Sequence, residues 1–312
     1  MNLQRCQYVF LYQIVDSFSS PFLLIFRHNP AIAILDFKHP SDNPAHGPSR
    51  QGGQFLGKLG AENAMHLEAA LVNAILEAQR GTFASLAPGE PGMINELGVS
   101  VSPFFPVVGN EVLPESPLTA IRGGLGAGVP VVVGSNYDET TLWGYGDVDL
   151  GRLVNVAQAF GDAGLVDKYR GTRPDATPAE LMIAMTTDHM FRIPAIRLAE
   201  ARFALGESVW MYLFCWNSRA FEGRLKATHA LEIPFAFDNL DRSGVDVFLG
   251  DGSTPQGVAD VMHRAWTAFI RNGDIGWDQY DVQRRATMRF SEVSEVVDDP
   301  DGRERAAWEG LR

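Results

Sequence analysis

The chain has 312 residues, enough for one large α/β domain or two smaller ones, and its apolar fraction of 46% is sufficient for a core. Its formal net charge of −12 argues against a nucleic-acid partner and against adhesion to an anionic membrane, because both need clustered Lys and Arg. The two cysteines, Cys6 and Cys215, argue against a disulfide framework and favour a reducing compartment.

Targeting signals are weak. No apolar run reaches the roughly 18 residues that a membrane-spanning helix needs. The N-terminal stretch YVFLYQIV after Arg5 is short for a signal peptide, is interrupted by Gln13, and no small-residue cleavage site follows it. We therefore expect a cytoplasmic protein.

Residues 1–60 differ in composition from the rest of the chain. They contain no Glu and carry a net charge of +2, and the stretch KHPSDNPAHGPSRQGGQ (38–54) has the Pro, Gly, Ser and Asn content of coil. Two interpretations stay open, a variable N-terminal extension or a segment foreign to the following domain. We expect residues 1–60 to be poorly ordered or outside the domain, and residues 61–312 to form it.

Predicted strands and helices alternate from residue 61 onward. A helix is expected over 61–80, where the apolar residues Met65, Leu67, Ala69, Leu71, Ile75 and Leu76 fall largely on one stripe. A Pro- and Gly-rich connection follows over 86–98. The stretch VPVVVG (129–134) is β-branched and bounded by turn residues, which is typical of a central strand buried on both faces.

Five further helices and one strand are predicted after it. The helix over 149–160 has Asp149 as its N-cap, and the helix over 177–190 has Thr177 as a cap, Pro178 at its first position and Glu180 three residues after the cap. A helix over 194–205 ends near Gly206. The apolar strand SVWMYLFCW (208–216), a helix over 254–273 and a terminal helix over 299–311 complete the pattern, which indicates an α/β fold with a mainly parallel sheet.

No cofactor or metal site is expected. The glycines of GGLGAG (123–128) precede a strand, whereas a dinucleotide-binding loop follows one and opens a helix. The segment is better explained as a helix end and a tight turn. No Cys and His spacing suggests zinc.

Residues capable of acid–base chemistry follow two of the predicted strands. Asp138 and Glu139 come directly after the strand at 129–134, and His229 lies in a loop after the strand at 208–216. Functional side chains in open α/β sheets gather beyond the carboxyl ends of strands, and a carboxylate that fixes an imidazole is the acid–base half of a catalytic triad. The alternative is an exposed acid at a strand end and an unrelated loop histidine.

Four segments, in order, resemble the type-B carboxylesterases, relatives of the cholinesterases and of bacterial para-nitrobenzyl esterases. SPFFPVVGNEVLPESPLTAI (102–121) resembles the segment before the acid strand, and VPVVVGSNYDET (129–140) resembles the acid motif, typically Gly-x-Asn-x-Asp-Glu-Gly. THALEIPFAFDNL (228–240) resembles the histidine motif. AWTAFIRNGDIGWDQY (265–280) resembles the closing helix and tryptophan loop.

The resemblance implies a partial α/β-hydrolase fold, the C-terminal part of a mainly parallel sheet with flanking helices. It further implies Glu139 as the acid and His229 as the general base of a Ser-Glu-His triad that hydrolyses carboxylic esters without cofactor or metal. Two departures are Gly109-Asn110 in place of Asp-Gly, and Thr140 in place of the glycine after the acid. Trp143 and Tyr145, near the acid, either border a substrate pocket or are ordinary packing residues.

The nucleophile motif of that family, Gly-x-Ser-x-Gly, does not occur in the sequence. GPSRQ (47–51) and GVSVS (98–102) each lack the final glycine. We therefore expect a truncated esterase that is inactive alone, with an unpaired sheet edge at the strands 129–134 and 208–215. The alternatives are a non-catalytic remnant or interaction module, and one half of a split esterase that acts on a small ester once an N-terminal esterase fragment joins it.

Overall fold

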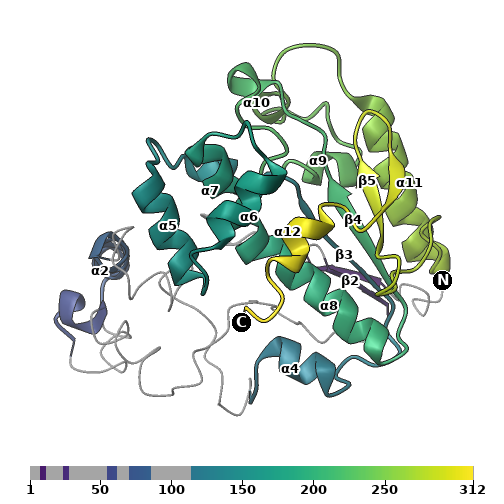
Figure 1. Ribbon diagram of the computed structural model, residues 1–312, viewed down its shortest axis with the longest axis horizontal. Coiled ribbons are helices and arrows are strands. Elements are labelled where there is room, and N and C mark those ends of the chain that lie inside the picture. Colours follow the sequence, from purple (N-terminus) through teal and green to yellow (C-terminus); the bar gives the residue numbers. More distant parts are fainter. Residues whose placement is uncertain (1–7, 12–23, 28–54, 62–69, 86–113, 312) are drawn as a thin grey trace.

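The computed structural model describes residues 8–11, 24–27, 55–61, 70–85 and 114–311, which contain a six-stranded sheet with helices on both faces (Figure 1). The strands lie in the order in which they occur in the chain: β1 Tyr8–Leu11, β2 Leu24–Arg27, β3 Val131–Asn136, β4 Val209–Phe214, β5 Ala286–Phe290 and β6 Glu295–Asp298.

The sheet is mixed rather than mainly parallel. The pairs β3–β4 and β4–β5 are parallel, and the pairs β1–β2, β2–β3 and β5–β6 are antiparallel. β5 and β6 are separated by a short turn, and a connection of that length permits only an antiparallel pair. The α/β architecture expected from the sequence is present, with its parallel part confined to the three central strands.

Helices cover both faces of the sheet. The helical elements are α2 Val72–Ser85, α4 Pro117–Arg122, the 3-10 helix η2 Glu139–Trp143, α5 Leu150–Ala159, α6 Leu165–Thr172, α7 Pro178–Thr187, the π-helix η3 Asp188–Arg192, α8 Ile193–Ala204, the 3-10 helix η4 Ala220–Gly223, α9 Ile233–Ala236, α10 Asp246–Leu249, α11 Gln256–Asn272 and α12 Gly302–Ala306. In Figure 1, α8 crosses one face of the sheet with α12 nearby, and α11 lies beyond the strands. No helix of the described residues combines the length and apolar character needed to cross a bilayer.

Successive residues of β3 and β4 point into two different cores. Val131, Val133, Val209 and Met211 join the core beneath α5 to α8. The residues between them, Val132, Trp210, Tyr212 and Phe214, join the core beneath α9 and α11. Both strands are buried along their whole length, as the β-branched and aromatic runs predict for central strands.

Gly134 permits the close approach of β3 and β4. A Cβ at this position would lie 2.2 Å from the carbonyl oxygen of Tyr212 and 2.5 Å from its ring. Because the two strands are paired at this position, neither backbone can move away without breaking the ladder. The absence of a side chain at Gly134 therefore lets the end of β3 pair closely with β4, directly before the loop that carries Glu139.

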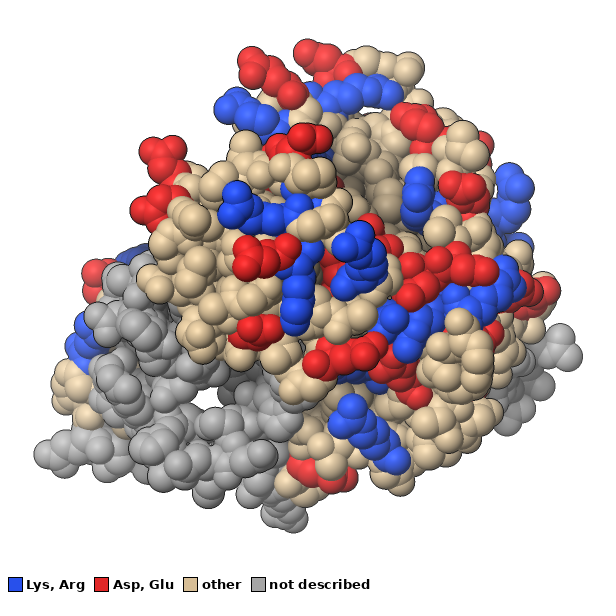
Figure 2. All heavy atoms as spheres, in the orientation of Figure 1, with Lys and Arg blue, Asp and Glu red and all other residues tan. Residues whose placement is uncertain are grey.

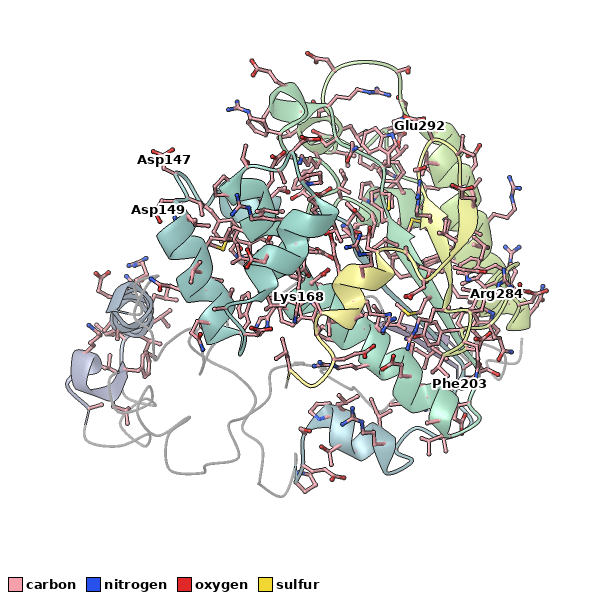
Figure 3. All side chains as sticks on the ribbon, viewed as in Figure 1. Asp147, Asp149, Lys168, Phe203, Arg284 and Glu292 are labelled. Carbon is pink, nitrogen blue, oxygen red and sulfur yellow. The ribbon has the colours of Figure 1, made fainter. Side chains whose placement is uncertain are left out.

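Local capping signals correctly placed the starts of α5 and α7 and the ends of α8 and α11, whereas the predicted terminal helix over 299–311 is limited to α12 at Gly302–Ala306. Asp149 accepts a hydrogen bond from the backbone of Arg152 at the start of α5, where Figure 3 labels it. Thr177 and Glu180 form the predicted reciprocal capping box of α7. Gly206 and Gly273 take the left-handed conformation just after α8 and α11.

The first predicted helix and the sheet edge differ from expectation. Leu71, which directly precedes α2, is 79% exposed, and Val72 and Leu76 within α2 are 69% and 44% exposed. The N-terminal part of the predicted stripe lies outside the described residues. The predicted unpaired edge is wrong for Val131 and Val132 of β3, which pair with Phe26 and Ile25 of β2. It is also wrong for β4, which pairs with β3 on one side and with β5 on the other. Beyond β1, β2 and residues 55–61, the segment 1–60 lies outside the described residues, so its separation from the domain stays a prediction.

Charged side chains of both signs are interspersed on the face shown in Figure 2. Several of them pair, as Arg284 does with Asp278 and Asp298. Such exposed pairs add little to stability, about 0–1 kcal/mol each.

Candidate active site

Glu139 stands at the point where β3 has ended and the 3-10 helix η2 begins. Its carboxylate is buried, and Oε1 accepts a hydrogen bond of 2.8 Å from the backbone N–H of Asn136. The neighbouring N–H of Asp138 donates to the carbonyl oxygen of Ala227 at 3.0 Å. The loop that carries the acid is therefore attached to the loop that carries His229.

His229 contacts Glu139 through two hydrogen bonds, although 90 residues separate them in the chain. Nδ1 of the imidazole lies 2.6 Å from Oε2 of Glu139, and the backbone N–H of His229 donates to the carbonyl oxygen of Glu139 at 3.1 Å. Because the carboxylate can only accept, Nδ1 carries the hydrogen and the neutral imidazole keeps its lone pair on Nε2. The structure brings the two predicted site residues together in the geometry of an acid–base pair.

The electrostatic surroundings favour the protonated imidazole. Burial lowers the pKa of His229, but the charge of Glu139 and its hydrogen bond outweigh that effect and leave the pKa raised. Removal from water strengthens this attraction because it lowers the local dielectric constant. The pair can therefore stabilise an imidazolium as it forms.

Two aromatic side chains flank the imidazole. The ring of Trp143, at the end of η2, is centred 5.5 Å from that of His229, and the ring of Phe191 is centred 5.3 Å away. Phe191 comes from the π-helix η3, and such wide turns often occur at functional sites. Of the two aromatic candidates near the acid, Trp143 lies against the histidine, whereas Tyr145 donates its hydroxyl to Thr186 and packs on α7.

Thr140 is fully buried and ties the acid loop to α7. Its hydroxyl lies 2.7 Å from that of Thr186 and donates to the carbonyl oxygen of Ile183 at 3.2 Å, and its N–H donates to the hydroxyl of Thr187 at 3.3 Å. It is not among the described residues with positive φ, so this position does not require glycine. The departure from the family motif adds contacts to the loop instead of distorting it. The other departure, Gly109-Asn110, lies outside the described residues.

Asn136 and Glu232 belong to the site and were missed by sequence reasoning. Nδ2 of Asn136 donates to the carbonyl oxygen of Thr228 at 2.7 Å and to Oε2 of Glu232 at 2.5 Å. Burial, and then the charge of Glu139, raise the pKa of Glu232 to about 7. The available signals were the position of Asn136 at the end of a predicted strand and that of Glu232 three residues after His229, but neither indicates a contact.

Two other histidines, His189 and His263, lie among the described residues, and each contacts a group outside the Glu139–His229 pair. His189, in η3, is buried and stacks on Phe160 at 3.8 Å, and Nδ1 of His263 lies 2.9 Å from the carbonyl oxygen of Ala236. Both belong to helices as predicted. His28, His39, His46 and His66 lie outside the described residues.

Candidates for a metal or a thiol nucleophile are weak in the part of the chain that the structure describes. That part contains no group of three His, Cys, Asp or Glu side chains arranged to hold a metal ion. Burial raises the pKa of Cys215 to about 12, which keeps its thiol protonated and unreactive at neutral pH. What the arrangement offers is proton transfer at Nε2 of His229.

Comparison with known proteins identifies the family of the chain. Residues 62–308 match the model of the carboxylesterase family. The chain is 29% identical over 212 residues to para-nitrobenzyl esterase of Bacillus subtilis (strain 168), and 30% identical over 213 residues to phenmedipham hydrolase of Pseudarthrobacter oxydans. Each alignment covers 65% of this chain and 42% of the relative, so the chain spans less than half the length of these relatives.

Solved structures give the same result for the fold. A carboxylesterase of Geobacillus stearothermophilus superposes with a TM-score of 0.68 at 31% identity, over 83% of this chain and 54% of that chain. The part of the α/β-hydrolase fold that this chain forms is the one predicted from its motifs. By the match over residues 62–308, this chain belongs to the carboxylesterase family.

Proposed function

We propose that Glu139 and His229 are the acid and the general base of a carboxylic ester hydrolase whose nucleophilic serine is supplied from outside this sequence. The contact of 2.6 Å between Oε2 of Glu139 and Nδ1 of His229 carries the proposal. The contact fixes the tautomer in which Nε2 accepts a proton, as the base of a hydrolase requires.

The proposed reaction has two stages, and in each stage Nε2 takes up one proton and gives it away again. As the serine oxygen attacks the ester carbonyl, its proton moves to Nε2, and the proton then passes to the departing alcohol as the acyl-serine forms. Water repeats the cycle, giving its proton to Nε2 while it attacks the acyl group. The free acid then leaves and the serine recovers its proton. Glu139 keeps its hydrogen bond to Nδ1 and stabilises the imidazolium at each stage.

The serine and the donors that would hold the oxyanion are not assigned to any residue of this chain. Gly-x-Ser-x-Gly does not occur in the sequence, and removal of both nucleophile and oxyanion donors eliminates nearly all hydrolytic catalysis. We therefore propose that the chain alone does not turn over esters, and that a small carboxylic ester becomes its substrate when an N-terminal esterase fragment completes the site. The missing motif equally favours a second candidate, a non-catalytic remnant or interaction module in the cytoplasm.

A complementation assay tests the proposal. Hydrolysis of short-chain p-nitrophenyl esters is measured with the chain alone, and then with a separately produced polypeptide carrying the Gly-x-Ser-x-Gly part of a related carboxylesterase. We expect turnover only in the mixture, abolished by His229→Ala and retained by His263→Ala, whose side chain bonds to a backbone carbonyl outside the site.

Three results would count against this proposal. Turnover by the chain alone would place the nucleophile within this sequence. Activity of the mixture that survives His229→Ala would remove the assigned base. A mixture that forms a complex yet hydrolyses nothing would favour the non-catalytic module.

A further inference from the structure

Asn136 connects three groups of the acid–base site from the end of β3. Its backbone N–H donates to Glu139, and the two hydrogens of its amide go to the carbonyl oxygen of Thr228 and to Oε2 of Glu232. Both amide hydrogens are therefore used, which fixes the orientation of the side chain. Thr228 immediately precedes His229, so the same amide holds the peptide that presents the imidazole.

Glu232 is a buried carboxylate that the proposed reaction does not use. It lies just before α9, three residues after His229, and is 5% exposed. In the described part of the chain no Lys or Arg forms an ion pair with it, and Asn136 is its side-chain partner. Burial of a carboxylate without a cation is costly, and an apolar residue would avoid that cost.

Two buried carboxylates thus belong to the network around the histidine. Glu139 bonds to Nδ1, and Glu232 is held by Asn136 in the turn that follows the imidazole. The charges of both glutamates raise the pKa of His229 against the effect of burial. Glu232 in turn responds to Glu139 and His229, the first of which disfavours its ionisation and the second of which favours it.

We infer that Glu232 is a positioning residue of this site, fixed by Asn136, whose negative charge adds to that of Glu139 in stabilising protonated His229. The inference deepens the proposed function, because it concerns the same acid–base pair. Loss of the charge leaves the Glu139–His229 contact in place but weakens the field that favours the imidazolium. Glu232 acts through His229 and does not touch the reacting atoms.

The test measures the titration of His229 in the full chain by NMR of its imidazole carbon-bound protons, assigned by their loss in His229→Ala. Glu232→Gln keeps an oxygen that can accept from Asn136 and removes only the charge. We expect its His229 midpoint to fall by about 0.5 pH unit or more. Glu200→Gln, which removes a carboxylate paired with Arg285, is the matched control and should leave the midpoint in place.

An unchanged midpoint in Glu232→Gln overturns the inference. If that variant does not fold, Glu232→Leu, which fills similar space without a charge, must show the same fall. Glu139→Gln separates the two proposals, because it should lower the midpoint by removing the nearer charge. A fall with Glu232→Gln but none with Glu139→Gln would overturn the proposed pair and leave the effect of Glu232 standing.

Discussion

Glu139 and His229 are joined twice, by the bond from Nδ1 to the carboxylate and by the bond from the backbone N–H of His229 to the carbonyl oxygen of Glu139. The second bond fixes the histidine loop on the acid loop even when the side chains rotate. Substitution of Glu139 by Gln therefore removes the negative charge beside the imidazole but leaves the backbone bond that positions the histidine loop.

Glu139→Gln should remove a pH-dependent part of the stability. The raised pKa of His229 means that the folded chain binds a proton more tightly than the unfolded chain. This contribution is fully present below the unfolded value, about 6.5, and is lost as the pH rises through the folded value. Urea unfolding should show a larger loss of free energy for Glu139→Gln at pH 6 than at pH 9. Equal losses at both pH values would contradict the coupling.

Glu232→Gln should become relatively more stable as the pH rises. The pKa of Glu232 is raised from 4.5 to about 7, so the wild-type chain loses stability between these values as the buried group ionises. At 1.36 kcal/mol per unit, the difference amounts to about 3 kcal/mol. Compared with the wild type, the variant should gain up to that amount between pH 4.5 and pH 8 in denaturant titrations. A relative stability that does not change with pH would refute the prediction.

Thr140→Gly, which restores the residue typical of the family motif, should destabilise this chain. The glycine deletes the buried hydroxyl that contacts Thr186 and Ile183, and it also increases the freedom of the unfolded backbone. Thr140→Val, which keeps the branched shape, isolates the hydroxyl and should cost about 1–3 kcal/mol. Thr267→Val is the control, because that hydroxyl only bonds to carbonyls of its own helix. A Thr140→Gly variant as stable as the wild type would show that the contacts with α7 contribute nothing.

Gly134→Ala should be severely destabilising, by about 3 kcal/mol or more, because the new methyl group meets the backbone of the paired strand. Gly257→Ala is the matched control. It lies in the first turn of α11 with no atom within 4 Å of the added carbon, and should gain about 0.5–1 kcal/mol. Thermal and urea unfolding of both variants measure the contrast. Two variants of similar stability would mean that β3 and β4 can separate at Gly134.

Several helices and strands could be predicted from sequence signals that span only a few residues. Thr177 and Glu180 marked the start of α7 because a capping box is a contact across one turn, and the apolar runs at β3 and β4 marked strands buried on both faces. β5 and β6 were missed, because ATMRF and EVVD contain charged and polar residues that do not alternate cleanly. Their identity as strands depends on pairing with β4 and with each other.

The amino-acid sequence by itself determined the α/β pattern, the family motifs and the order in which Glu139 precedes His229. Capping, hydrophobic periodicity and motif spacing are local properties, so they can be seen without a folded chain. Only the tertiary structure decided that Phe191 lies against the imidazole and that Asn136 connects Glu139, Thr228 and Glu232. Such contacts join residues far apart in the chain, and a buried polar group finds its partner through packing that no local pattern encodes.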